Sequence, residues 1–506
     1  MTHSPRWPRR AVVDIGSNSV RLVIFSGPPR APISIVNEKV LCGLGDREPD
    51  TGKLREEPFN RAIATLRRFR AILDAEEIQS EDVVATAAVR DAPNGAEFLE
   101  VARTAGFNVR LISGDEEARL AGLGILCSAH EIARDSRPVL GGDLGGGSLE
   151  LSRLGGPDGA RVHQTVSLPV GALRMLTEYR GDLAAVDQVA RRSFAEVPWL
   201  RQADLQSLYI VGGSWRALAR ISIQKNKHPV SVLDHYTVDR ESMLEICRYA
   251  EAEDTDIISK ISGVQKKRVP TLPGAAVVLR CLIEHTAIER VIVSACGVRE
   301  GLLFDRMSDE ERRGDPLLAL AQDLAERSEG GRLPDPSAVS AFLDPLFTEP
   351  KRLRRLRYTA ARMIRGASLA HPEQRAKHAA SLVMATPFLG IDHRERTILA
   401  VMMLARFGGS ISKDGRDLPL SLIDHNDVTY AVQVGYAHRL VAALNRPAFS
   451  SNSGFALSKT DKSLRLTIEP SAVSLFAEAA LKEFDRLADA FDLRPEVITP
   501  AHSQEQ

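Results

Sequence analysis

The chain has 506 residues, of which 44% are hydrophobic and 26% are charged. That length exceeds what one hydrophobic core sustains, so we expect several domains, and the composition excludes disordered and collagen-like chains. The 66 Lys and Arg residues balance 66 Asp and Glu residues. This balance argues against a basic coat for nucleic acid, and it confines any polyanion binding to a local site.

The cysteines and the apolar runs indicate the cellular setting. Five cysteines lie far apart without a Cys-x-x-Cys pair, which argues against a disulfide framework and favours a reducing cytoplasm. The basic start imitates an export signal, but Asp14, Asn18 and Arg21 interrupt the following apolar stretch, so we expect mature sequence. The apolar run from Thr397 to Ala405 is about half the length of a membrane span and suits a buried helix, so we expect no membrane span.

From Arg10 to about Asp305 the sequence alternates between strand-like and helical patterns. Strand-like runs such as Val291 to Val293 alternate with helical patterns such as Phe59 to Leu73, and this alternation predicts α/β layers. After Asp305, charged and Gly/Pro-rich stretches lead into long amphipathic segments, which predict a helical domain.

Strand patterning returns only near the end of the chain. It covers Phe455 to Leu457 and Ser463 to Glu469, and a last helical run follows from Ala472 to Phe491. We therefore expect a small α+β tail. The predicted domains are 1–135, 136–308, 309–446 and 447–506.

An internal repeat is the most informative feature of the sequence. The stretch from Asp14 to Leu22 and the stretch from Asp143 to Leu151 share one ungapped pattern: Asp, aliphatic, Gly, two small residues, Ser, aliphatic, charged, Leu. Each copy reads as a strand, a tight turn and a second strand. Two copies more than a hundred residues apart predict two lobes of similar build, with the site in the cleft between them.

The two turns have the composition of phosphate clamps. Gly and small residues expose backbone N–H groups in one concavity, which binds anions. Ser19 and Ser148 add hydroxyl donors, and Asp14 and Asp143 offer oxygen ligands for Mg²⁺. Either copy alone is more simply an ordinary hairpin with Asp as the turn former. Both copies in one register favour opposed turns that grip a phosphate.

Two glutamates are candidates for the chemistry. Glu150 shares a strand face with Ser148, so it is a candidate metal ligand or water-orienting base, the alternative being a solvated strand residue. Ser113 and Glu116 match a helix capping box, whereas Glu117 falls on the inward face of the same helix. We therefore predict Glu117 as general base.

Other polar segments carry weaker signals. Arg90, expected at a strand end, could clamp phosphate oxygens, although a surface salt bridge is the commoner role. Gly213 belongs to a Gly-Gly-Ser strand-to-helix turn. The basic segment with Arg354, Arg355 and Arg357 predicts a track for a long polyanion, the alternative being a solvated helix face. A weaker patch covers 266–268.

Together these motifs resemble the exopolyphosphatase and guanosine pentaphosphate phosphatase (Ppx/GppA) family, within the actin-like, sugar-kinase-like ATPase superfamily. The resemblance covers about 300 residues. Its motifs run Asp14 to Leu22, Ala85 to Asn94, Ile112 to Arg119, Asp143 to Glu150 and Gly297 to Gly301. This sequence departs from the family pattern at Leu149, where the family usually has Thr. It departs again at Ser214 and the bulky Trp215, which follow Gly213.

The resemblance implies two ribonuclease-H-like lobes, Mg²⁺ dependence and hydrolysis of a terminal phosphoanhydride. It implies Glu117 and Glu150 as catalytic residues and Asp143 and Glu150 as metal ligands. The substrate-binding set is Asp14, Gly16, Ser17, Asn18, Ser19, Arg90, Gly145, Gly146, Gly147, Ser148 and Gly213, with Arg354, Arg355 and Arg357 as the track.

The expected activity is release of orthophosphate from inorganic polyphosphate by a homodimer. Guanosine pentaphosphate 5′-phosphohydrolysis at the same site stays an alternative, as do a superfamily kinase and a non-catalytic nucleotide-sensing protein. The resemblance also implies that the helical domain is HD-like. Here Asp392-His393 and Asp424-His425 have the reversed order, so we expect no second metal centre in it.

Overall fold

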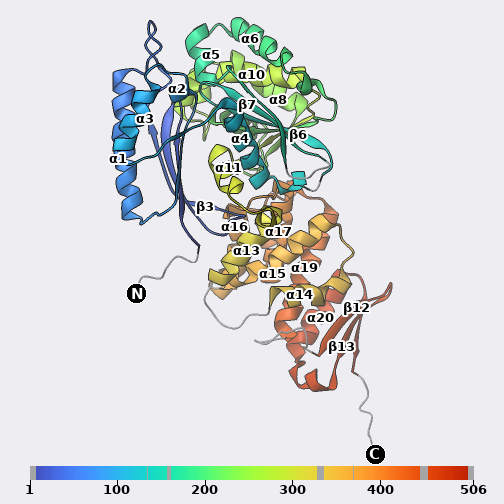
Figure 1. The fold of residues 1–506 in the computed structure, drawn as a ribbon. Helices are drawn as coiled ribbons and strands as arrows, with labels where there is room; N and C mark the ends of the chain where they lie inside the picture. The colour runs from blue at the N-terminus through green and yellow to red at the C-terminus, as the bar shows by residue number, and fades with distance from the viewer. Residues whose placement is uncertain are drawn as a thin grey trace, which may run out of the picture. The chain divides into compact units, whose positions relative to one another are not determined.

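The computed structural model describes residues 7–133, 135–156, 161–327, 335–368, 370–444 and 454–499. The chain divides into two compact units, Met1–Pro316 and Leu317–Gln506 (Figure 1). The first unit contains both halves of the internal repeat, and the second contains the helical segment together with the tail. The division into four domains stays a prediction, and the break between the units falls at 316/317 rather than at 308/309.

Two sheets of the same strand order form the centre of the first unit. The first has the order β3-β2-β1-β4-β5, and the second has the order β10-β11-β9-β6-β7-β8. In each sheet three consecutive strands are antiparallel, and the first of the three also pairs in parallel with the fourth strand, β4 or β9. The prediction of two lobes of similar build is therefore confirmed. The strands are β1 (Arg10–Ile15), β2 (Ser19–Ser26), β3 (Ile33–Leu41), β4 (Glu81–Ala85), β5 (Arg110–Leu111), β6 (Pro138–Leu144), β7 (Leu149–Gly155), β8 (Val162–Leu168), β9 (Ser207–Val211), β10 (Thr237–Asp239) and β11 (Arg290–Val293).

Helices cover the outer faces of both sheets (Figure 1). α1 (Glu56–Ala75) confirms the predicted helical pattern, because Ala62, Leu66, Phe69 and Leu73 recur at helical spacing and are all buried. The outer side of the second sheet is built around α10, which packs against α6 and α8. The remaining helices of this unit are α2 (Ala87–Arg90), α3 (Gly95–Thr104), α4 (Gly114–Ser128), α5 (Ala172–Tyr179), α6 (Leu183–Ala195), α7 (Gly213–Lys225), α8 (Arg240–Ala252), α9 (Thr255–Ser259), α10 (Leu272–His285), α11 (Val298–Asp305) and α12 (Asp309–Arg313).

Helices α4 and α11 cross each other in the middle of the first unit (Figure 1). Glycines make their close approach possible. A Cβ atom on Gly124 would lie 2.1 Å from the carbonyl oxygen of Gly297, and one on Gly301 would lie 1.9 Å from that of Leu120. Backbone packs on backbone at this crossing, so neither position has room for a side chain.

The second unit is helical with a small sheet. Its helix α17 (His393–Arg406) contains the apolar run Thr397 to Ala405, which is buried as predicted. The predicted strands appear as β12 (Phe455–Lys459) and β13 (Ser463–Ile468). A third strand, β14 (Arg494–Ile498), pairs in parallel with β13 and was not predicted. The other helices are α13 (Pro316–Arg327), α14 (Pro336–Leu343), α15 (Lys351–Ser368), α16 (Arg375–Ala385), α18 (Ile411–Asp414), α19 (His425–Leu444) and α20 (Glu478–Ala490).

The helix crossing gives a stability prediction. Gly124→Ala and Gly301→Ala should each lower the free energy of unfolding by about 2 kcal/mol, because a methyl group there overlaps backbone atoms that cannot move aside alone. Chemical denaturation followed by circular dichroism measures the loss.

The matched control is Gly274→Ala in α10, where a Cβ atom would lie 3.4 Å from Cβ of Met175, an ordinary contact. That variant should be as stable as the parent protein. An equal loss in all three variants would contradict the close crossing.

Candidate functional site

The two copies of the repeat form two hairpins with the same register. In the first, Asp14 pairs with Arg21, and in the second, Asp143 pairs with Glu150. The closing hydrogen bonds match too. Gly16 N–H donates to Ser19 O over 3.1 Å, and Gly145 N–H donates to Ser148 O over 2.9 Å. The predicted strand–turn–strand repeat is therefore confirmed down to single residue pairs.

The second turn presents its amides because its carbonyls are bound elsewhere. The start of α5 holds them: Ala172 N–H donates to Gly145 O, and Leu173 N–H donates to Gly146 O. Nε of Arg174 donates to Gly147 O. Among the described residues, the N–H groups of Gly146 and Gly147 donate to no backbone carbonyl. Such a turn offers N–H groups to an anion.

The first turn is arranged in the same way. The carbonyls of Ser17 and Asn18 accept hydrogen bonds from Gly45 N–H and Gly43 N–H. Within the described part of the chain, the N–H groups of Ser17 and Asn18 have no backbone acceptor. The two turns therefore carry unused donors of the same kind.

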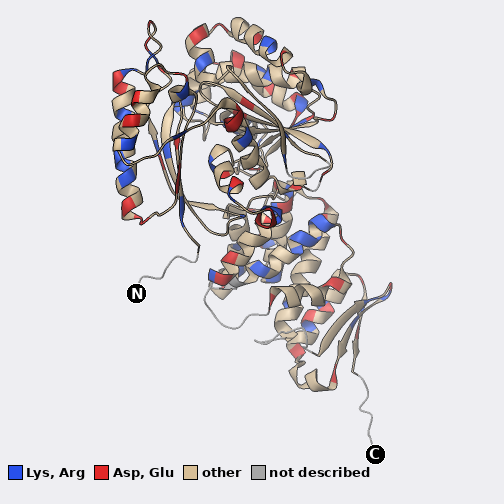
Figure 2. Ribbon diagram, in the orientation of Figure 1, with Lys and Arg blue, Asp and Glu red and all other residues tan. Residues whose placement is uncertain are grey.

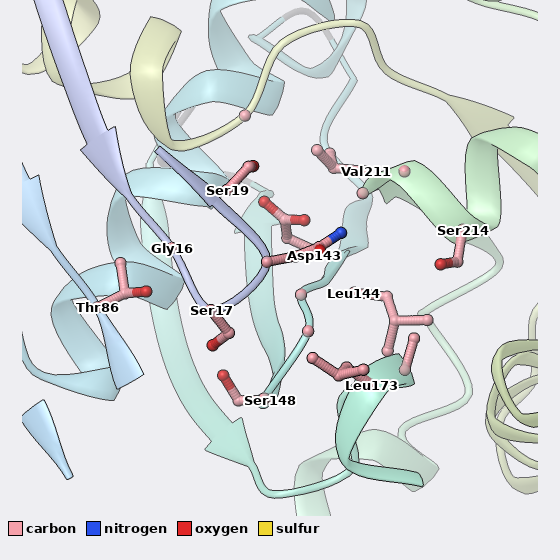
Figure 3. Close-up of a pocket in the computed structure, with 18 of the residues that line it drawn as sticks. Gly16, Ser17, Ser19, Thr86, Asp143, Leu144, Ser148, Leu173, Val211 and Ser214 are labelled. Atoms are coloured by element: carbon pink, nitrogen blue, oxygen red, sulfur yellow. The ribbon is translucent and has the colours of Figure 1, made fainter. Parts of the chain in front are cut away.

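The turns face each other across one pocket, of about 380 Å³. Ser17 and Ser148 lie opposite each other, and the Asp143 side chain lies in the same pocket (Figure 3). A Cβ atom on Gly147 would lie 3.3 Å from Oγ of Ser17, so the two turns approach each other closely at this side of the pocket.

A third turn completes this side of the pocket, at the start of α7. Gly212 has φ of 95° and its Cβ would lie 2.4 Å from Leu144 O, so only glycine fits. Gly213 and Ser214 line the pocket. The bulky Trp215 is fully buried and donates Nε1–H to Ala275 O over 3.0 Å. This departure from the family pattern therefore packs into the core and does not line the pocket.

Carboxylates gather at one end of the pocket. Glu150 is 2% exposed; its Oε1 accepts a 2.9 Å hydrogen bond from Ser167 Oγ. Burial raises the pKa of Glu150 to about 7 and that of Asp143 to about 6. Burial also raises the pKa of Asp14, against the attraction of Arg299 and Arg21. These acids are held close enough for their charges to repel.

Glu117 reaches the pocket from the first turn of α4, which confirms the prediction that it faces inward. Burial raises its pKa, and the charge of Glu150 raises it further. Among the described residues, its buried Oε2 has no hydrogen-bond partner. An unused, buried carboxylate oxygen is available to a water or ligand in the pocket.

The carboxylate of the neighbouring Glu116 binds an arginine outside the pocket. Ser113 Oγ accepts the N–H of Glu116 over 3.1 Å, as the capping prediction required. The carboxylate of Glu116 does not complete the box. It accepts from Arg119 Nε at 2.8 Å, and Arg119 also binds Asp305. Glu116 thus stabilises the junction of α4 with α11.

Arg90 stands behind Glu117. It ends the short helix α2 rather than a strand, and it does not line the pocket. Its Nη1 donates to Ile112 O and lies 3.7 Å from Oε2 of Glu117. Arg90 therefore places a positive charge beside the carboxylate of Glu117.

Cationic side chains line the rest of the pocket. They are Arg21, Lys39, Arg216, Lys267, Arg268 and Arg299, which we call the cationic wall. Two of them belong to the predicted basic patch 266–268, whereas Lys39 and Arg216 were not predicted. Burial and the neighbouring cations lower the pKa of Arg21 to about 10 and that of Lys39 to about 8. Mutual repulsion among these groups favours an anion between them.

The predicted polyanion track on α15 is wrong for two of its three arginines. Arg357 is 1% exposed and binds Glu349 and Asp344. Arg355 is buried and donates to Gly390 O. Only Arg354 has an exposed side chain, at 48%. α15 can bury Arg357 because Glu349 and Asp344 neutralise its charge.

The burial of Arg357 gives a stability prediction. Arg357→Met should lower the free energy of unfolding by about 3 kcal/mol, because it removes the cation that hydrogen-bonds Glu349 at 2.8 Å and leaves only Arg354, 3.9 Å away. Urea denaturation measures the change. Arg354→Met is the matched control and should stay within about 0.5 kcal/mol of the parent; equal effects at both positions would contradict the buried pair.

The oxygen donors at the acid end fit a magnesium ion. Glu150 is buried and Asp143 is partly buried, and a hard cation would neutralise the charge of both carboxylates. Nowhere in the described ranges do three or more His, Cys, Asp or Glu side chains form a metal-binding group. Mg²⁺ usually takes only one or two protein carboxylates, with water and phosphate oxygens as its other ligands. Asp143 and Glu150 suffice for that arrangement.

The reversed Asp-His pairs of the second unit have structural roles. Asp392 Oδ1 accepts Glu395 N–H over 2.7 Å and caps α17. Asp424 Oδ1 accepts Asp427 N–H over 2.8 Å beside the start of α19. The HD-like character of this unit stays a prediction.

Comparisons with known proteins identify the family of this chain. The Ppx/GppA phosphatase family model matches residues 12–310. "Exopolyphosphatase 1" of Mycobacterium tuberculosis is 25% identical over 348 residues, which are 66% of this chain and 98% of that protein. No helix among the described residues is long and apolar enough to cross a membrane.

Solved structures show the fold of the first unit. The Aquifex aeolicus member of the Ppx/GppA family is 24% identical with a TM-score of 0.51, covering 60% of this chain and 99% of that one. An exopolyphosphatase from Cytophaga hutchinsonii is 22% identical with a TM-score of 0.52, covering 59% and 99%. The expected two-lobed, actin-like architecture is confirmed.

Proposed function

Because the chain belongs to the Ppx/GppA phosphatase family, we propose that it is an exopolyphosphatase that releases orthophosphate from the end of inorganic polyphosphate. The observation that carries this proposal is that one pocket holds a cluster of carboxylates, its acid end, next to a cationic wall. A polyphosphate places one phosphate at the reacting end and several negative charges behind it. The pocket offers hydrogen-bond donors for the terminal phosphate and cations for the negative charges behind it.

The turns bind the terminal phosphate. The free N–H groups of Ser17, Asn18, Gly146 and Gly147 point their dipoles at it, and Ser19 and Ser148 line the same pocket. These donors are in place before substrate arrives, so little reorganisation accompanies the reaction. They stabilise negative charge on the transferred phosphoryl oxygens.

Glu117 orients and deprotonates the attacking water. Its Oε2 has no other hydrogen-bond partner among the described residues and receives the proton. Burial raises the pKa of Glu117, which makes it a stronger base than an exposed glutamate. Arg90, 3.7 Å away, fixes this carboxylate. Water attacks in line with the departing phosphate chain.

Mg²⁺ held by Asp143 and Glu150 would neutralise charge on the phosphate oxygens. Without it, the carboxylates that line the pocket would repel the substrate. The homodimer and the cytoplasmic location stay predictions.

The decisive assay measures phosphate release from long polyphosphate, guanosine pentaphosphate and ATP, each with Mg²⁺ and with EDTA. We expect polyphosphate to be the best substrate and EDTA to abolish release. Release from the pentaphosphate alone would assign the alternative phosphohydrolase. Release from none of them would support a non-catalytic protein and contradict the proposal.

The role of Glu117 has its own test. Glu117→Gln should lower kcat at least about a hundredfold while polyphosphate still binds, because the amide accepts no proton. Initial rates and a binding titration with polyphosphate measure the two effects.

Glu116→Gln is the matched control on the next residue, whose carboxylate binds Arg119 outside the pocket. Its kcat should stay close to that of the parent. Normal turnover in Glu117→Gln would remove Glu117 as the base.

A further inference from the structure

Lys39 occupies a particular position in the cationic wall. It lies on β3 opposite Arg21 of β2, and Arg21 lies opposite Asp14 of β1. Residues paired across neighbouring strands share a face, and all three side chains line the pocket. Lys39 is therefore the outermost member of a row that starts at the acid end. Its side chain is half-buried.

The charged groups around Lys39 are almost all positive. Within the described chain, no carboxylate lies within 4.0 Å of its amine, and no carboxylate is among the main charges that act on it. The cations that act on it come from three further elements: Arg21 on β2, Lys267 and Arg268 on the segment before α10, and Arg299 on α11. Asp14 stands two strands away, with Arg21 between them.

These surroundings increase the fraction of the Lys39 amine that is neutral. Burial and the neighbouring cations lower the pKa of Lys39 to about 8. Roughly a quarter of the amine is then neutral at pH 7.5, against about a thousandth for an ordinary lysine. A lysine beside other cations is a nucleophile for this reason. The arginines of the wall remain charged and cannot react in this way.

We propose that Lys39 Nζ is an acylation site whose donors are acyl phosphates. Such a donor carries a phosphate, which the cationic wall and the turns bind, and an electrophilic carbonyl next to it. The proposal rests on the phosphate binding of the proposed function.

The step balances without another reactant. The Nζ lone pair attacks the carbonyl carbon, an N–C bond forms, and the C–O bond to phosphate breaks. Inorganic phosphate leaves and the amine proton goes to solvent, so the product is an amide. Acylation removes one positive charge from the wall and weakens its hold on a polyanion, which would regulate the enzyme.

The full-length protein incubated with acetyl phosphate tests the site directly. Mass spectrometry of proteolytic peptides gives the acetylation rate of each lysine. Lys39 should react at least about tenfold faster than the exposed Lys53, which does not line the pocket. Lys267 lines the same pocket but is exposed, so it should also react more slowly than Lys39. Equal rates at Lys39 and Lys53 would overturn the proposal.

A second reagent tests the class of donor. The N-hydroxysuccinimide ester of acetic acid carries no phosphate, so it should favour Lys39 over Lys53 less than acetyl phosphate does. Inorganic pyrophosphate should suppress the reaction of Lys39 with acetyl phosphate and leave Lys53 unaffected. The same preference with both reagents would overturn the assignment of acyl phosphates.

The consequence is measured with two variants. Lys39→Gln should raise the KM for polyphosphate about tenfold, since a charged hydrogen bond to phosphate is lost. Lys39→Arg should raise KM less, because it keeps the charge, and it should remain active after acetyl phosphate treatment that inhibits the parent. Equal KM values in Lys39→Gln and the parent would overturn the regulatory consequence.

Failure of this proposal is distinct from failure of the proposed function. The acetylation readout needs no turnover. Phosphate release with an unreactive Lys39 contradicts only the acylation site. A reactive Lys39 in a protein that hydrolyses no substrate contradicts only the exopolyphosphatase.

Discussion

The crossing of α4 and α11 is the contact on which the arrangement of the site depends. Each helix delivers a charged residue to the pocket from its first turn: Glu117 from α4 and Arg299 from α11. Because Gly124 and Gly301 let the two backbones touch, the starts of the helices are held at one distance. Protein interiors resist even small changes of volume. The spacing between the base and one member of the cationic wall is therefore set by packing.

Charge in this protein is organised locally. The chain as a whole is neutral, and basic and acidic segments are interspersed over the helices of both units (Figure 2). Inside the pocket acids and cations are neighbours: Arg299 and Arg21 act on Asp14, and Arg216 acts on Asp143. Each group raises the energy of its like-charged neighbours. Binding of Mg²⁺ and a polyanion together would relieve both repulsions.

The sequence predicted what local patterning determines. The two hairpins, the inward position of Glu117 and the first two strands of the tail all follow from spacing within about ten residues. Lys39, Arg216 and Arg299 were missed because each is an isolated cation until the sheets and helices assemble. Arg299 stands inside a motif that the sequence analysis noticed without giving it a role.

Two errors have a common physical origin. The α15 arginines were expected on the surface, but Glu349 and Asp344 neutralise Arg357 in the interior, and charge alone does not reveal which face of a helix is buried. β14 was not expected because its five residues, one of them a proline, are all exposed and show no alternating pattern. Its pairing with β13 comes from tertiary structure.

The way α5 holds the second turn has a consequence for how quickly ligands exchange. Amides of α5 and the Arg174 side chain already fix the carbonyls of Gly145, Gly146 and Gly147, so no segment has to order when an anion arrives. Binding then loses little conformational entropy. The association rate should be governed by diffusion and electrostatic steering, without a slow closing phase. Release, in turn, should be governed by how quickly water replaces the phosphate oxygens at the turn amides.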